Sequence, residues 1–318
     1  MTILATIDEV RTGQEMALVA AVIGLMGILI LLWRRRLLQG TTLMAPWYWS
    51  VLSLFVVAGS EVLITWPGDG LPAGWHEPVR FAAGATVFCP CMAALGAKRP
   101  QDKAWQLIVL SLWAILVLPA FENMLLQPGQ PMEIKDARSW FLVSLIVVGA
   151  VNTLPTRFWP SALLLTAAQT LLFAPYLPVV NTPLAAPSRL AGLLLCVIAI
   201  GLVAVGLPPR RAVKLPVDRL WLDFRDGYGT FWALRLAERI NAAGSMYHWN
   251  ITLTWRGFRT TDVTDVADEL TPQVAEGIHR TINNLLRRFV SPQWISRRLD
   301  ANAAIVEPRG YESAPSLK

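Results

Sequence analysis

The sequence predicts a mainly α-helical membrane protein: a polytopic bundle of seven transmembrane helices, followed by a small helix-rich α+β cytoplasmic domain. The chain of 318 residues is 54% hydrophobic and only 16% charged, whereas about a quarter of the residues in soluble proteins are charged. The charge is also uneven, because 16 of the 28 Lys and Arg residues follow residue 207. Long apolar runs recur before that point. A membrane domain followed by a water-soluble one accounts for this composition.

Seven apolar runs meet or approach the length of about 18 residues that a helix needs to cross the hydrocarbon. The third run is rich in Ala and Gly, and Pro155 ends the fifth. The predicted spans are 15–33, 44–66, 79–97, 105–126, 139–156, 158–179 and 188–207. The predicted domains are an extracytoplasmic segment over 1–14, a membrane domain over 15–207, a soluble domain over 208–300 and a disordered tail over 301–318.

The short connections indicate the orientation, because cytoplasmic loops carry an excess of Lys and Arg. With the N-terminus outside, ten basic residues lie inside and five outside, whereas an arrangement without the third span gives six inside and nine outside. Tryptophans near the span ends agree with the first arrangement, since indole rings favour the headgroup level. We therefore expect a multi-pass protein of the cell membrane, specifically a bacterial inner membrane, with the C-terminal domain in the cytoplasm.

The C-terminal domain reads as a soluble fold with 16 basic and 12 acidic residues after residue 207. Apolar residues at helical spacing predict one amphipathic helix over 217–243, in which Gly227 and Gly229 weaken the helical propensity of the middle. Alternating side chains predict a strand over 249–255. Thr271-Pro272 and Ser291-Pro292 are typical helix starts and predict two further helices.

The predicted strand has no evident partner, and a single strand is an incomplete sheet. Its partner is expected from residues 208–217 or 257–266, from a second protomer or from another protein. We therefore expect docking of a protein partner or self-association through residues 208–300, in addition to contact with the lipid bilayer. The candidate docking residues are the aromatic side chains of Phe224, Tyr228, Trp232, Trp249 and Trp255.

Two carboxylates inside predicted spans are the clearest polar anomaly. Glu61 lies in the second span and Glu122 near the outer end of the fourth. A charge inside the bilayer is costly, so such carboxylates usually face a bundle interior, a partner or a water-filled cavity. The loop beside Glu61 adds Asp69, His76 and Glu77. Together these residues predict an outward-facing site for proton exchange or a hard divalent cation; the alternative is that the glutamates simply reach water at the span ends.

Cys89-Pro90-Cys91 in the third span predicts a helix kink beside two soft sulfur ligands. The tripeptide resembles the intramembrane motif of copper-transporting P-type ATPases. That family also needs an Asp-Lys-Thr-Gly motif, and the nearest residues here, Asp102-Lys103-Ala104, lack the threonine and glycine. The chain is therefore not assigned to that family. A metal or redox role for the cysteines and a packing role for a small-residue face are both open.

No Walker motif, nucleophile elbow, HExxH or kinase motif set is present, and no cofactor is expected. Basic residues after residue 207 are mixed with acidic ones, which is not typical of a nucleic-acid surface. The leading hypothesis is a membrane scaffold, sensor or accessory subunit with a cytoplasmic docking domain. One alternative is a proton- or cation-coupled transporter that uses Glu61 and Glu122. A second is a membrane enzyme with an outward-facing centre of Glu61, His76 and Glu122.

Overall fold

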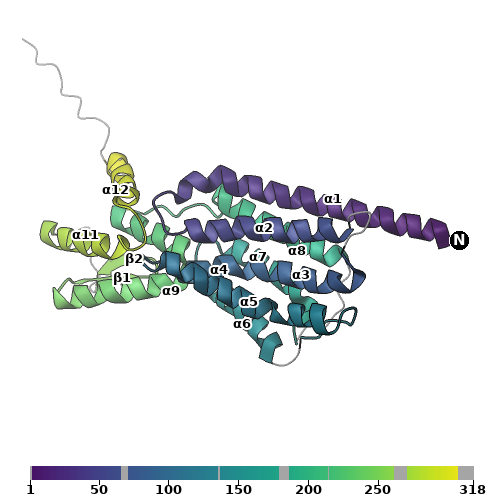
Figure 1. The fold of residues 1–318 in the computed structure, drawn as a ribbon. Helices are drawn as coiled ribbons and strands as arrows, with labels where there is room; N and C mark the ends of the chain where they lie inside the picture. The colour runs from purple at the N-terminus through teal and green to yellow at the C-terminus, as the bar shows by residue number, and fades with distance from the viewer. Residues whose placement is uncertain are drawn as a thin grey trace, which may run out of the picture. The chain divides into compact units, whose positions relative to one another are not determined.

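The computed structural model describes residues 2–65, 71–134, 137–178, 186–213, 215–260 and 271–306. These residues are mainly α-helical, with one small antiparallel hairpin. Contacts divide the chain into two units (Figure 1). One unit consists of Met1–Arg210 together with Tyr228–Trp232, and the other of Arg211–Gly227 together with Ala233–Lys318.

The first unit is built from helices alone in the part of the chain that the structure describes. Its helices are α1 (Thr2–Arg34), η1 (Arg35–Leu38), α2 (Met44–Thr65), η2 (Ala73–Trp75), α3 (His76–Ala85), η3 (Thr86–Phe88), α4 (Cys89–Leu95), α5 (Asp102–Leu126), α6 (Ala137–Thr153), α7 (Trp159–Phe173), η4 (Ala174–Tyr176) and α8 (Ala186–Val205).

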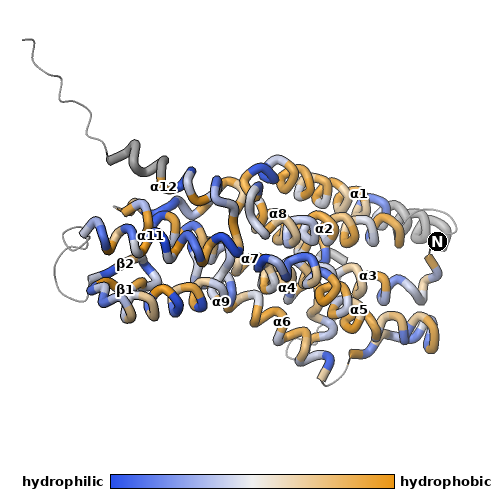
Figure 2. The backbone as a smooth tube through the Cα atoms, turned by 60° about the vertical axis from the view of Figure 1, so that its left-hand side comes forward, coloured by the Kyte–Doolittle hydropathy of each residue, from blue (hydrophilic) through white to orange (hydrophobic). Residues whose placement is uncertain are grey.

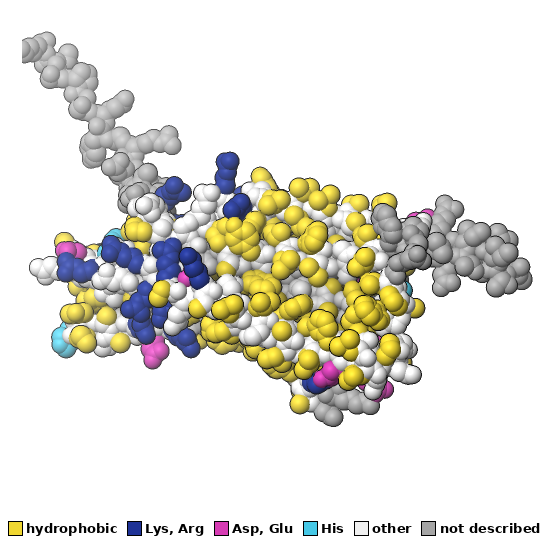
Figure 3. All heavy atoms as spheres, viewed as in Figure 1, with side chains coloured by type: hydrophobic (Ala, Val, Ile, Leu, Met, Phe, Trp, Pro, Cys, Tyr) yellow, Lys and Arg dark blue, Asp and Glu magenta, His cyan; other side chains and the backbone are white. Residues whose placement is uncertain are grey.

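Among the described residues, five helical stretches are long and apolar enough to cross a membrane. They are Thr12–Leu38, Met44–Thr65, Ala73–Leu95, Asp102–Leu126 and Ser188–Val205. Figure 2 shows α1, α2 and α5 as largely hydrophobic, and Figure 3 shows hydrophobic side chains over most of the visible face of this unit. Such helices are typical of a multi-pass membrane protein. With 17 and 15 residues, α6 and α7 are shorter than the spans predicted over 139–156 and 158–179.

The Ala- and Gly-rich third stretch runs without a break through η2, α3, η3 and α4 and has 23 residues. Of its most apolar window, 61% is buried, against 17–33% in the other four long helices. Small side chains let neighbouring helices approach closely in a membrane bundle. The modest hydrophobicity of this stretch therefore follows from its contacts with protein on most sides.

Two clusters of buried side chains form the core of the first unit. The larger one joins α3, η3, α4, α5, α6, α7 and η4 around Phe81, Phe88 and Phe173. The smaller one joins α1, α2 and α8 around Ala20, Leu54, Val57 and Val197. Helices α7 and α8, α1 and α2, and α1 and α8 pack against one another along their lengths.

The second unit contains most of α9 (Pro216–Met246), β1 (Ile251–Thr254), β2 (Gly257–Thr260), α11 (Pro272–Leu286) and α12 (Pro292–Val306). The three helices predicted from the sequence all form, and the Thr271 side chain caps α11 by accepting a hydrogen bond from the Val274 N–H. The first of them, predicted as one continuous helix, is kinked at Gly229, with φ +81° and ψ −177°. The helix α12 continues to Val306, beyond the residue at which we predicted disorder, and residues 307–318 lie outside the described residues.

The predicted strand pairs within the same chain. β1 and β2 form an antiparallel hairpin in which Leu253 faces Phe258 and Ile251 faces Thr260. Ile251, Leu253 and Phe258 are all buried. The second strand therefore comes from the 257–266 segment, one of the sources we expected, and the case for association that rested on a lone strand loses its support.

Candidate functional site

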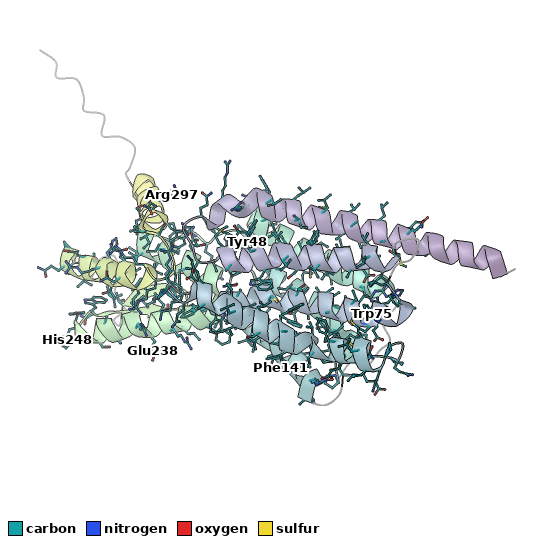
Figure 4. The ribbon with its side chains drawn as sticks, viewed as in Figure 1. Tyr48, Trp75, Phe141, Glu238, His248 and Arg297 are labelled. Atoms are coloured by element: carbon teal, nitrogen blue, oxygen red, sulfur yellow. The ribbon has the colours of Figure 1, made fainter. Side chains whose placement is uncertain are left out.

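A cavity of the first unit with several charged lining residues lies between α2, α3, η4 and α8, with Leu172 of α7 also in its lining. Its volume is about 380 Å³. Trp75 directly precedes α3 at this end of the unit (Figure 4). The cavity is lined by Val57, Ser60, Glu61, Glu77, Arg80, Phe81, Gly84, Leu172, Pro175, Tyr176, Arg189, Leu190 and Leu193. Charged and apolar side chains therefore line the same cavity.

Glu61 and Arg80 form a fork-like ion pair across this cavity. Arg80 Nε donates to both carboxylate oxygens, at 3.0 Å and 3.1 Å, and Arg80 Nη2 donates to Oε2 at 3.0 Å. The two side chains are only 18% and 23% exposed, so water weakens the pair little. Charge-assisted bidentate pairs are the strongest of the ordinary hydrogen bonds. The pair joins the C-terminal end of α2 to α3.

Glu77, at the start of α3, holds two other segments. Its Oε1 accepts a hydrogen bond from the Tyr176 hydroxyl at 3.0 Å, and its Oε2 accepts one from the Met132 N–H at 3.2 Å. The Tyr176 ring packs edge-on against Phe81, with the ring centroids 4.9 Å apart. Both oxygens of Glu77 are thus used to position η4 and the segment that precedes α6.

Arg189, near the start of α8, is the second cation of the cavity. Its Nη1 atom lies 3.9 Å from Glu61 Oε1, which is an ion-pair distance but too long for a hydrogen bond. Among the described residues this buried nitrogen has no hydrogen-bond partner. A buried donor without an acceptor is costly, so its presence in a cavity marks a place where a ligand can supply the missing oxygen.

The structure places only part of the predicted acidic site in this cavity. Glu61 and Glu77 line it. His76 Nε2 lies 3.0 Å from the Leu71 carbonyl oxygen and is not among the lining residues. Asp69 lies outside the described residues.

Glu122 does not converge with Glu61, contrary to the hypothesis of a shared site. It pairs with Arg138, which donates from Nη1 at 2.8 Å and from Nη2 at 3.2 Å. These side chains are 42% and 52% exposed. Each carboxylate therefore has an arginine of its own, and the assumed contact between the two glutamates was wrong because helix spacing alone does not determine which faces meet.

Sequence reasoning missed Arg80 and Arg189 as members of the site. Both were counted only as basic residues of outer connections, although each stands at the edge of an apolar run. A basic residue at the edge of a span, with a carboxylate at the same predicted depth in another span, is the signal that could have found them.

Cys89 and Cys91 are free thiols at the start of α4, directly after the 3-10 segment η3. The helix therefore changes its winding at the predicted kink. Cys89 is buried, and a Cβ added to Gly149 of α6 would lie 3.6 Å from Cys91 Sγ, so the second thiol faces α6. Within the described residues, no group of three His, Cys, Asp or Glu side chains is placed to hold a metal ion.

Two of the five candidate docking residues are core residues. Phe224 is fully buried and packs edge-on against Phe289, with centroids 5.2 Å apart. Tyr228 is 2% exposed, and its hydroxyl lies 3.2 Å from Thr42 Oγ1. Phe224 and Tyr228, which we assigned to a partner, therefore belong to the protein's interior, since the apolar face of an amphipathic helix usually packs within the protein.

The other three aromatic residues are half-buried. Trp232 Nε1 donates to the Ala94 carbonyl oxygen within the first unit. In the second unit, Trp249 stacks on Tyr247 with centroids 5.9 Å apart, and His248 between them has a φ of +52° (Figure 4). Arg225 lies over the Trp255 ring, 5.0 Å from its centroid. Trp249 and Trp255 are accessible to a partner only in part.

The kinked segment of α9 is bound to the helices of the first unit, to which it belongs. Asn152 of α6 accepts a hydrogen bond from the Phe231 N–H through Oδ1 at 3.2 Å, and its carbonyl oxygen accepts one from Thr230 Oγ1 at 3.1 Å. Thr42 Oγ1 donates to the Ala97 carbonyl oxygen beside the Tyr228 hydroxyl. Five consecutive residues, Tyr228–Trp232, therefore fold with this unit.

Comparisons with known proteins find no matching family model, no similar curated protein and no similar solved structure.

Proposed function

We propose that this chain is a multi-pass membrane sensor or accessory subunit that binds a small ligand in the cavity of Glu61, Arg80 and Arg189. The observation that carries the proposal is the combination of a cavity of about 380 Å³ with a buried arginine nitrogen that has no hydrogen-bond partner among the described residues. Ligand sites in proteins are concave and mostly apolar, with a few polar groups that orient the ligand. This cavity has that composition.

The proposed topology has seven spans with the N-terminus outside and the C-terminal domain, residues 208–300, in the cytoplasm. The excess of basic residues in the connections supports this orientation. The 17 residues of α6 extend about 25 Å at the rise of an α-helix, and η4 prolongs α7 toward the same length. In this arrangement the ligand cavity lies in the outer half of the membrane, because Glu61 is four residues from the end of α2 at Thr65.

Cysteine labelling tests this topology. Gln127 follows α5 on the proposed outer side, whereas Gln101 precedes α5 and Met246 ends α9 on the inner side; all three are exposed. In intact cells a membrane-impermeant maleimide should label a cysteine at position 127 but label positions 101 and 246 only after permeabilisation. Labelling of position 246 in intact cells would place the C-terminal domain outside.

The contacts of Glu61 favour ligand binding over ion transport. Both of its oxygens already accept hydrogen bonds from Arg80, and Glu122 stands at a separate, exposed pair. A transporter that passes a proton or cation between the two glutamates has no support from this arrangement. An acid–base centre of Glu61, His76 and Glu122 has none either, because only Glu61 of the three lines the cavity.

A thermal-stability screen of the full chain in detergent tests the binding proposal. Leu190 lines the cavity beside Arg189, so Leu190→Trp should fill part of the volume. Compounds that occupy the cavity should raise the unfolding midpoint of the wild type and leave that of Leu190→Trp unchanged. If every compound that stabilises the wild type stabilises Leu190→Trp equally, the cavity is not the binding site.

The proposed partner of residues 208–300 is best sought at Trp249, which is half-buried and follows the exposed side chains of Met246 and Tyr247. A photo-crosslinking amino acid at position 249 of the full chain should give a discrete adduct in cells, either with a second copy or with another protein. The same group at the buried position 224 is the control. Equal adduct patterns at the two positions, or none at 249, would remove the support for docking at this surface.

A further inference from the structure

We infer that the cavity between α2, α3, η4 and α8 binds the oxyanion of an amphiphile, with the negatively charged head at Arg189 and a hydrocarbon chain along the apolar walls. This inference rests on the proposed ligand-binding function and specifies the class of ligand.

The hydrogen bonds of the carboxylates argue against a cation as the ligand. Both oxygens of Glu61 accept from Arg80, and both oxygens of Glu77 accept from Tyr176 and Met132. The four carboxylate oxygens thus already have donors from the protein. No carboxylate of the cavity is left to attract a metal ion or an ammonium group as its principal partner.

The hydrogen bonding of Arg189 is incomplete, in contrast to that of the two carboxylates. Its Nη1 has no acceptor among the described residues, and the nearest carboxylate oxygen, Oε1 of Glu61, is 3.9 Å away and is already bonded to Arg80. A guanidinium presents its N–H groups in a planar fork that matches the oxygens of a carboxylate or phosphate. A ligand oxyanion at Arg189 would supply an acceptor for this nitrogen.

The remaining walls of the cavity are apolar. The apolar lining residues include Val57, Phe81, Leu172, Leu190 and Leu193. Phe81 is held in place by edge-on contacts with Phe173 and Tyr176, at 5.6 Å and 4.9 Å between ring centroids. A hydrocarbon chain gains free energy by leaving water for such a surface. A fully polar oxyanion, such as inorganic phosphate, would leave these walls without contacts.

Two sources could supply this chemistry, a membrane phospholipid or a free carboxylate amphiphile. Both present an oxyanion next to a hydrocarbon chain, and the contacts described above do not distinguish one source from the other. The experiment therefore needs one arm for each source.

Binding of decanoate, decyl phosphate and decanol to the full chain in phosphatidylcholine nanodiscs tests the inference, because the three probes share one chain length. The two anions should bind the wild type more tightly than decanol. Arg189→Gln should weaken anion binding about ten- to a hundred-fold, as expected for the loss of a hydrogen bond to a charged group, and leave decanol unaffected. Arg138→Gln is the matched control, since Arg138 also pairs with a glutamate but does not line this cavity.

The lipid arm uses mass spectrometry of the intact protein released from nanodiscs that contain phosphatidylglycerol. A retained phospholipid that is lost in Arg189→Gln and kept in Arg138→Gln identifies the lipid as the source and supports the inference. Anion-selective binding of decanoate with no retained lipid supports it with a free amphiphile as the source.

Two results would overturn the inference. They differ in whether the proposed ligand-binding function is retained. If decanol binds as tightly as decanoate and Leu190→Trp abolishes both, the cavity is a ligand site but not one for oxyanions. If no probe or lipid distinguishes the wild type from Leu190→Trp, the proposed binding function fails as well.

Discussion

A Cβ added to Gly229 would lie 2.5 Å from both Nδ2 and Oδ1 of Asn152, so the backbone of α9 meets this α6 side chain with no room for a methyl group. Gly229 has φ +81° and ψ −177°, a region open essentially to glycine alone. Asn152 also accepts the Phe231 N–H through Oδ1. The kink and the amide therefore hold each other in place.

Gly229→Ala should destabilise the full chain by about 1–3 kcal/mol, because an alanine at this φ and ψ is strained and its Cβ would clash with Asn152. The thermal unfolding midpoint in detergent measures the effect. Gly201→Ala in α8 is the control, since a Cβ there meets no atom within 4 Å. Equal midpoints for the two variants would contradict the contact with Asn152.

Asn152→Ala should also reduce the free energy of unfolding, by about 1–3 kcal/mol, since the Phe231 N–H would be left without its acceptor. The thermal unfolding midpoint should fall accordingly. The alanine would also remove the atoms that crowd position 229. The double variant Gly229→Ala/Asn152→Ala should therefore lose less stability than the sum of the two single losses. Strictly additive losses would mean that the two residues do not act on each other.

Glu61→Gln should destabilise the chain more than Glu122→Gln. Glu61 is 18% exposed, and its neutralisation removes the carboxylate that pairs with both Arg80 and Arg189 among the described residues, whereas Glu122 is 42% exposed. We expect a cost of roughly 1–3 kcal/mol for the first substitution and a smaller one for the second, because water screens an exposed ion pair. Unfolding midpoints of the two variants in the same detergent give the comparison, and a larger effect at Glu122 would reverse the ranking.

The extent of the apolar runs was enough to predict the long helices, because a helix that faces lipid must be apolar along most of its length. The capped start at Thr271 was equally readable, since the signal lies within four residues of the chain. The glycines near the middle of α9 indicated weak helical propensity there, but neither the kink nor its contact with Asn152.

The site was only half predictable, because it depends on which helix faces meet. Glu61 was recognisable as a costly charge within an apolar run, but nothing in its spacing indicated that Arg80 would pair with it or that Glu122 would take Arg138. The docking role predicted for Phe224 and Tyr228 failed for a related reason. Periodicity shows that Phe224 and Tyr228 lie on an apolar face but not whether that face covers a partner or the protein's own core.

Asp218, at the start of α9, should make the stability of the second unit depend on pH. Its Oδ1 accepts a hydrogen bond from the Phe258 N–H of β2 at 2.8 Å. Burial raises the pKa of this carboxyl, while that hydrogen bond and the charge of Arg259 oppose the increase. The folded protein thus holds the proton of Asp218 more tightly than the unfolded chain does.

The stabilisation from protonated Asp218 is fully present below the unfolded pKa of about 4 and is lost as the pH rises through the higher pKa of the folded state. Asp218→Asn keeps an acceptor for the Phe258 N–H and carries no charge, so its stability should lack this loss. The thermal unfolding midpoint of Asp218→Asn should therefore rise relative to that of the wild type as the pH is raised from about 4 to about 7. Asp218→Ala, which removes the acceptor, should be less stable than Asp218→Asn throughout. A difference between Asp218→Asn and the wild type that stays constant over this range would show that the folded state leaves the proton affinity of Asp218 unchanged.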